Sequence, residues 1–222
     1  VLEHADKALA AAATGLSTSR ALSVRLAALL HDADDRKYFP KNPEGECPNA
    51  KRAMEEAGAK PEEVKSALRM IDLVSCSKNG NSAPPDTLKE PELLWPRWAD
   101  RLEAAGEIGV VRCWQFNTEK GAKLCVATTP RPKTEAEVWE LATPERFEQY
   151  QTSGGKSDSM MDHYYDKLLR VACPPAHLLR NSYLEAEMSK RAAPLVDVCL
   201  EYGKAGEVPL EKIRAMAARL AA

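Results

Sequence analysis

Apolar residues recur at helical spacing along most of this 222-residue chain, and that periodicity constrains the fold more than any other feature. A clear example is one face of apolar residues three or four positions apart: Val64, Ala67, Leu68, Ile71 and Val74. Strand-like alternation is scarce, and residues 123–129 are the best candidate for a short hairpin. The sequence therefore predicts an all-α protein.

The same patterns divide the chain into helices and loops. Ser17, Thr18 or Ser19 is expected to cap the helix that ends near Leu30. The other expected helices cover 2–14, 48–58, a segment that starts at 60–63, the part of 91–114 that follows Pro96, 158–172, 177–203 and 209–221. Residues 115–157 are rich in turn residues and contain one helical island around 135–141. We expect one compact helical domain over 1–222, with a core at 1–114, a long, partly irregular excursion at 115–157 and C-terminal helices at 158–222.

Composition limits the kinds of partner. The net charge of −2, from 31 basic and 33 acidic residues, gives no general attraction to a nucleic-acid polymer or an anionic membrane. There is no apolar run of about 18 residues, so no membrane span is expected, and the first residues do not resemble a signal peptide. The 6 cysteines form no CxxC pair, which favours reduced thiols and a cytoplasmic location.

One stretch concentrates ionisable side chains where an apolar helical run ends. Residues 26–30 lead directly into His31 and Asp32, and Asp34, Asp35, Arg36 and Lys37 follow within a few positions. This stretch is either a solvated helix end or half of a metal-phosphate site. A metal site needs further imidazole and carboxylate ligands from other helices. The candidates are His4 and Asp100, which would complete a mixed nitrogen and oxygen set with His31 and Asp32.

The order of these residues resembles the HD-domain superfamily of metal-dependent phosphohydrolases. Within it, the chain resembles the nucleotide pyrophosphohydrolase-like branch. The segments that carry the resemblance are, in chain order, EHADKAL, LAALLHDADDRKYF, WADRLEAAGEIGVVRCW, HYYDKLL and LEAEMSKRAAPLVDVCLEY. One departure is Trp98, which stands where the branch commonly has an acid two residues before Asp100. The resemblance implies an HD-type helical bundle whose metal site lies within 1–114.

Each candidate site residue has an expected role. The predicted metal ligands are His4, His31, Asp32 and Asp100. Asp35 follows Asp32 by three positions and could orient or deprotonate a metal-bound water, as the resemblance also implies. Lys37 is expected to assist catalysis and to bind a phosphate as a point charge. Further substrate contacts are expected from Arg101, Arg112, His163 and Lys167, of which the last two stand at i,i+4 spacing.

The resulting hypothesis is a metal-dependent phosphohydrolase that uses a metal-activated water. The resemblance implies a small phosphorylated substrate, a nucleoside or deoxynucleoside triphosphate, cut to monophosphate and pyrophosphate. Mn²⁺ or Mg²⁺ suits the ligand set, and Fe, Co or Ni would also bind it. The alternatives are a phosphomonoesterase, a cyclic-nucleotide phosphodiesterase and a non-catalytic metal-binding helical module. The stretch SGGKS lacks the spacing of a phosphate-binding P-loop.

Overall fold

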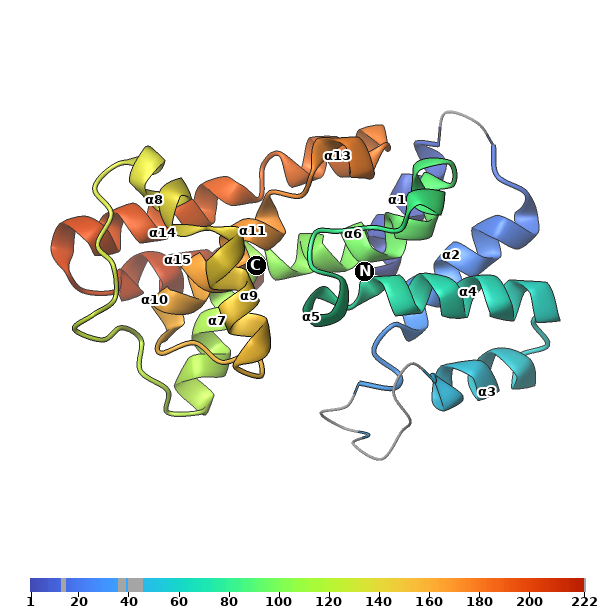
Figure 1. Cartoon of the computed structure of the whole chain (residues 1–222), viewed down its shortest axis with the longest axis horizontal. Helices are drawn as coiled ribbons and strands as arrows, with labels where there is room; N and C mark the ends of the chain where they lie inside the picture. Colours follow the sequence, from blue (N-terminus) through green and yellow to red (C-terminus); the bar gives the residue numbers. More distant parts are fainter. Residues whose placement is uncertain (13–14, 36–38, 40–45, 222) are drawn as a thin grey trace. The chain divides into compact units, whose positions relative to one another are not determined.

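The computed structural model describes residues 1–12, 15–35, 39 and 46–221, and these residues form helices and loops. None of them lies in a β-strand, which confirms the all-α prediction (Figure 1). The hairpin predicted at 123–129 is therefore wrong. Val126 and Thr129 instead close a turn through two hydrogen bonds of 2.9 and 3.0 Å. The carbonyls of Lys123 and Leu124 accept from the backbone N–H groups of Met160 and Met161, so they bond to the start of a helix and not to a strand.

The chain divides into two compact units. Unit 1 comprises Val1–Asp100 and Pro175–Ala186, and unit 2 comprises Arg101–Pro174 and Glu187–Ala222. The helices of unit 1 are α1 (Leu2–Ala10), α2 (Thr18–Leu30), α3 (Pro48–Glu56), α4 (Pro61–Val74), α5 (Cys76–Asn79), η1 (Pro85–Leu88), η2 (Pro91–Leu94), most of α6 (Trp95–Ala104), α12 (Ala176–Leu179) and the start of α13 (Ser182–Met188). The helices of unit 2 are α7 (Gly106–Glu119), α8 (Glu135–Leu141), α9 (Pro144–Thr152), α10 (Met160–His163), η3 (Tyr164–Leu168), α11 (Leu169–Ala172), α14 (Ala192–Ala205) and α15 (Leu210–Ala221).

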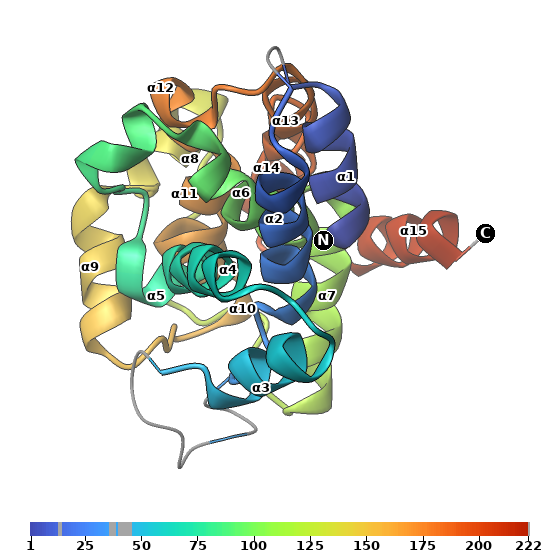
Figure 2. The same cartoon turned by 90° about the vertical axis from the view of Figure 1, so that its right-hand side faces the viewer.

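Helix α2 is the centre of unit 1. Figure 2 shows it between α1 and α4, and it packs against both. The Ser17 side chain caps its start by accepting a hydrogen bond from the backbone N–H of Arg20 at 3.2 Å. Ala27 and Ala28 are buried on α2, as is Ala8 on α1, and their small side chains allow the helices to approach closely. The end of α2 is therefore held on a rigid, well-packed support.

Unit 2 is built around a core of apolar side chains in which α7 packs against α14 and α15. The segment α10–η3–α11 runs continuously from 160 to 172, and η3 is a π-helix. π-helical turns are rare, and many of those known lie at functional sites. In this unit η3 packs against α9 and carries Tyr164, whose side chain is fully buried in the core.

Two long predicted helices are interrupted. The helix expected after Pro96 in the segment 91–114 is divided into α6 and α7, because Gly106 has a φ of +71° that ends the helical path. A side chain at this position would also meet Arg191, whose Cδ lies 2.8 Å from the place of a Cβ atom. The helix expected over 177–203 is divided into α12, α13 and α14, and Arg180 ends α12 with a φ of 44°.

The predicted excursion at 115–157 is partly helical. Its first residues extend α7, the expected helical island is α8, and α9 follows after two residues. Along the chain, the first boundary between the two units follows Asp100. Whether 1–222 folds as one domain remains a prediction. Over the described ranges, the helices are too short or too polar to cross a lipid bilayer.

Candidate functional site

The end of α2 fixes the orientation of His31. Leu30 is the last helical residue, and the chain turns at once, with the backbone N–H of Ala33 donating to Leu30 O at 3.0 Å. The His31 Nδ1 atom lies 3.0 Å from the carbonyl oxygen of Ala28 and donates its proton to it. This bond selects the tautomer in which Nδ1 carries a proton and presents Nε2 outward, as in many metal-binding histidines.

Two carboxylates face the other ring nitrogen of His31, Nε2. Nε2 lies 3.3 Å from Oδ2 of Asp32 and 3.5 Å from Oδ1 of Asp100, which comes from α6. The His31 side chain is 12% exposed and that of Asp100 33%, so the contact is partly shielded from water. The structure thus brings together three of the four predicted metal ligands.

The electrostatic environment of His31 favours positive charge at Nε2. Burial lowers the pKa of His31, but the hydrogen bonds and charges of Asp100 and Asp32 outweigh burial and raise the pKa to about 10. A neutral imidazole would point a lone pair at two carboxylates. The arrangement is therefore stable with a cation between these groups, which is a proton or a metal ion. Imidazole nitrogen and carboxylate oxygen are donor types that divalent metals accept.

His4, the fourth predicted ligand, lies in the first turn of α1. Its Nδ1 atom is 2.6 Å from the hydroxyl oxygen of Tyr183 on α13. Within the described ranges, three or more histidine, cysteine, aspartate or glutamate side chains nowhere form a group with the geometry to hold a metal ion. The four-ligand site therefore stays a prediction, supported by the three residues gathered at Nε2 of His31.

Asp34 has a structural role that sequence reasoning missed. Its carboxylate accepts hydrogen bonds from the backbone N–H groups of Asn49 at 3.0 Å and Ala50 at 2.9 Å, in the first turn of α3. The side-chain amide of Asn49 in turn donates a hydrogen bond to Ala33 O at 3.2 Å. Cys47, which precedes α3, supplies no side-chain cap. Asp34 therefore caps α3 from a distance and holds the turn after His31.

The two predicted catalytic residues, Asp35 and Lys37, follow Asp34 in the sequence. Asp35 is partly buried, and its backbone carbonyl accepts from the N–H of Phe39 at 2.9 Å. Its role toward a water molecule stays a prediction. Lys37 lies outside the described residues.

The other predicted substrate contacts belong to unit 2. Arg101 is 1% exposed, so its guanidinium group is withdrawn from solvent, whereas Arg112 is exposed and donates to Glu103 O at 2.9 Å. His163 and Lys167 share one face, as predicted from their spacing. The His163 ring centroid lies 5.3 Å and the Lys167 Nζ atom 5.6 Å from the ring of Tyr150. Their contact with a substrate stays a prediction.

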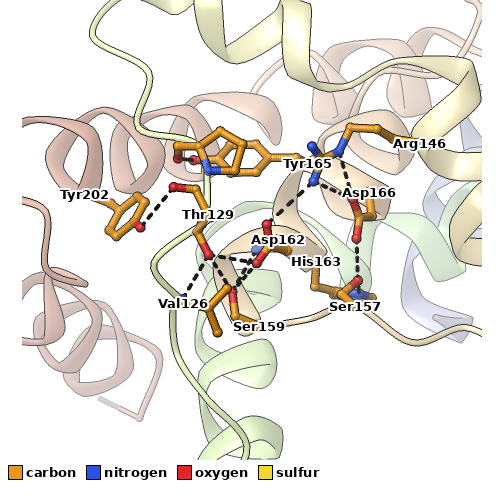
Figure 3. A network of polar contacts seen from close by, with 11 residues as sticks. Val126, Thr129, Arg146, Ser157, Ser159, Asp162, His163, Tyr165, Asp166 and Tyr202 are labelled. Atoms are coloured by element: carbon orange, nitrogen blue, oxygen red, sulfur yellow. Dashed lines mark hydrogen bonds and ion pairs between the residues drawn. The ribbon is translucent and has the colours of Figure 1, made fainter.

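A polar network lies beside that face (Figure 3). Asp162 accepts from the hydroxyls of Ser159 at 2.6 Å and Thr129 at 2.8 Å. Asp166 accepts from Ser157 Oγ at 2.7 Å and from Arg146 Nε at 2.9 Å.

Arg146 is the centre of this network, because its guanidinium group also lies 3.6 Å from Asp162. A polar cavity of about 350 Å³ opens next to Arg146, Tyr150 and Asp166. The carboxylates of this network have their hydrogen-bond partners within the protein. The network therefore has a structural role, which is to hold together α9, the 126–130 turn and the helix that begins with α10.

The comparisons with known proteins agree with the fold. No protein-family model matches the chain. A crystal structure of a protein from Lactobacillus plantarum is similar with a TM-score of 0.56 and 20% sequence identity, over 91% of this chain and 85% of that one. The chain is 36% identical over 214 residues to an uncharacterized protein, L803, of Acanthamoeba polyphaga mimivirus, which covers 91% of this chain and 84% of L803. The chain belongs to the same protein family as mimivirus L803.

Proposed function

We propose that the protein is an HD-type, metal-dependent phosphohydrolase that cleaves nucleoside or deoxynucleoside triphosphates to monophosphate and pyrophosphate. The observation that carries the proposal is the convergence of Asp32 and Asp100 on Nε2 of His31, within 3.3 and 3.5 Å. Asp32 lies in the turn that follows α2 and Asp100 lies on α6, and both stand in the HD pattern of the sequence. A solvated helix end would not require a carboxylate from α6.

His4, His31, Asp32 and Asp100 would hold the metal. When bound, a divalent metal lowers the pKa of a coordinated water and polarises a phosphoryl oxygen. Two imidazoles and two carboxylates suit Mn²⁺ or Mg²⁺ and would also accept Fe, Co or Ni. The Ala28 carbonyl holds the His31 ring in the tautomer that leaves Nε2 available as a ligand.

The remaining steps fall to side chains near the HD pair. Asp35 would orient the attacking water and accept its proton, because it follows Asp32 by one turn. Lys37 would neutralise negative charge that develops on the phosphate. Arg101, Arg112, His163 and Lys167 remain proposed substrate contacts, and exposed Arg112 has the cation most accessible to a ligand.

The substrate would be a small molecule in the cytoplasm. A net charge of −2 gives no general attraction for a polymeric nucleic acid, whereas a single nucleotide needs only local cations. All six cysteines are free thiols, as in proteins of reducing compartments.

The test is a product assay with purified full-length chain and Mn²⁺, in which phosphate and pyrophosphate are measured separately for a panel of triphosphates, monophosphates and cyclic nucleotides. The proposal expects pyrophosphate from triphosphates. Release of phosphate from monophosphates would instead indicate a phosphomonoesterase. Hydrolysis of cyclic nucleotides would indicate a phosphodiesterase. Full Mn²⁺ loading without turnover of any nucleotide would indicate a non-catalytic metal-binding module.

A further inference from the structure

A segment late in the chain completes unit 1. Residues Pro175–Ala186, here called the strap, belong to unit 1 although the preceding and following residues belong to unit 2. The strap contains α12, the start of α13 and the connection between them. Its position is relevant to the proposed site because it bonds to α1 and α6, the helices that carry His4 and Asp100.

Two hydrogen bonds hold the first half of the strap. Trp98 on α6 donates from Nε1 to the carbonyl oxygen of Leu178 at 3.2 Å, and both residues are buried. Arg180 donates from Nη1 to Leu88 O at the end of η1. The left-handed backbone of Arg180, with φ 44°, ends α12 and directs the chain toward α1. A non-glycine residue in this region costs free energy, which the surrounding bonds must offset.

Asn181 then joins the strap to α1. Its buried side chain donates from Nδ2 to Ala8 O at 2.8 Å and accepts from the backbone N–H of Leu184 at 3.1 Å. The bond from Leu184 caps the start of α13. The bond to Ala8 O joins the same side chain to α1, so Asn181 connects the start of α13 with α1. Tyr183 lies in this capped first turn and its hydroxyl reaches Nδ1 of His4 at 2.6 Å.

The start of α1 needs such support. Val1, which precedes the helix, makes no side-chain cap hydrogen bond, and the first turn of a helix has backbone N–H groups without helical partners. His4 is in this turn. A histidine that serves as a metal ligand must hold one ring orientation, which is usually fixed by a hydrogen bond to its other nitrogen.

We infer that Tyr183 is a positioning residue for His4, and this inference rests on the proposed metal site. Tyr183 Oη accepts the proton of His4 Nδ1, which leaves the Nε2 lone pair available for the metal. The carbonyl of Ala28 does the same for His31 at 3.0 Å. The strap thereby supplies, from a distant part of the sequence, a hydrogen-bond partner for the His4 side chain in the first turn of α1.

The test compares two hydroxyl deletions in the full chain by calorimetric titration with Mn²⁺. Tyr183→Phe removes the partner of His4, and Tyr165→Phe removes the hydroxyl that donates to Pro130 O at 3.1 Å in unit 2. Loss of a partner that orients a metal-binding histidine typically weakens metal affinity by about 10- to 100-fold. We expect that loss for Tyr183→Phe and unchanged affinity for Tyr165→Phe.

A second readout needs no variant. Long-range ¹H–¹⁵N NMR of the metal-free wild-type protein should show His4 protonated at Nδ1, and a His4 protonated at Nε2 would overturn the inference. Equal Mn²⁺ affinity in Tyr183→Phe and wild type would overturn the inference alone. A wild-type protein that binds no Mn²⁺ would overturn the proposed function and this inference with it.

Discussion

The Nε2 atom of His31 at the end of α2 lies 3.5 Å from Oδ1 of Asp100 on α6. This contact joins two helices that are distant in sequence and places a second carboxylate, from Asp32, at 3.3 Å from the same nitrogen. Two acids directed at one imidazole create a site for positive charge. The two carboxylates raise the pKa of His31 to about 10, so Nε2 carries a proton at neutral pH. The proposed metal would replace that proton.

Removal of His31 should strongly weaken metal binding. His31→Ala deletes the nitrogen on which both carboxylates converge, and we expect the Mn²⁺ affinity to fall by at least about 100-fold, since a whole ligand contributes more than a supporting residue. His177→Ala is the matched control, because His177 is exposed and distant in sequence from the HD pair. Calorimetric titration of both variants gives the comparison, and equal Mn²⁺ affinity in the two would contradict the assignment of His31.

Asp34 should contribute to stability through α3. Asp34→Ala removes the acceptor for the N–H groups of Asn49 and Ala50, and loss of such a cap costs about 1–2 kcal/mol of unfolding free energy. Urea denaturation at pH 7 measures this change. The exposed Asp158 serves as a control, for which alanine should change stability by less than about 0.5 kcal/mol. A neutral Asp34→Ala would show that water replaces the cap without cost.

The sequence predicted the helical class and much of the local structure because both depend on residues near one another. The N-cap of α2 was among three candidates, of which Ser17 is confirmed, and α15 begins one residue after its predicted start. The break at Gly106 could not be predicted, since it depends on Arg191, whose backbone carbonyl accepts from the glycine N–H at 2.9 Å. The missed cap by Asp34 has the same cause, because Asp34 and the first turn of α3 are not neighbours in the sequence.

At the candidate site, too, the sequence could not predict every contact between residues that are distant in the chain. Helical spacing and the HD pattern identified His31, Asp32 and Asp100, which the structure brings together. The partner of His4 was not predicted, because Tyr183 is in a segment whose return to unit 1 has no local signal. Sequence periodicity describes each helix separately, whereas these contacts depend on tertiary packing.

Gly106 should be intolerant of a side chain for two separable reasons. Gly106→Ala must hold a φ of +71° and place its Cβ atom 2.8 Å from Cδ of Arg191. Gly58→Ala measures the cost of the positive φ alone, because Gly58 has a φ of +80° and no atom lies within 4 Å of the added Cβ. We expect about 1 kcal/mol of destabilisation for Gly58→Ala and about 2–3 kcal/mol for Gly106→Ala by urea denaturation. Equal losses would show that Arg191 moves aside freely.

His163 should make stability dependent on pH. Burial, and then the charge of Lys167, lower the pKa of His163 to about 3 in the folded protein, against 6.5 for an ordinary histidine. The unfolded chain therefore gains a proton below pH 6.5 while the folded protein does not. Its contribution to stability is fully present above pH 6.5 and is lost as the pH falls toward 3, by at most about 1.4 kcal/mol per pH unit.

Urea denaturation of wild type and His163→Gln between pH 7 and 5 measures this effect. The variant should lose less stability than wild type over that interval, because glutamine does not titrate. Parallel slopes for wild type and His163→Gln would mean that the folded protein also protonates His163 in this range.

The central claim is tested most directly by the initial rate of pyrophosphate release from a deoxynucleoside triphosphate mixture in the presence of Mn²⁺. Wild type should release pyrophosphate and monophosphate in equal amounts. Asp100→Asn should reduce the rate by at least about 100-fold, because it removes the charge of a proposed ligand. The control Asp197→Asn, at a position with a 58% exposed side chain, should keep the wild-type rate. Absence of Mn²⁺-dependent pyrophosphate release by wild type, or an unchanged rate in Asp100→Asn, would contradict the account.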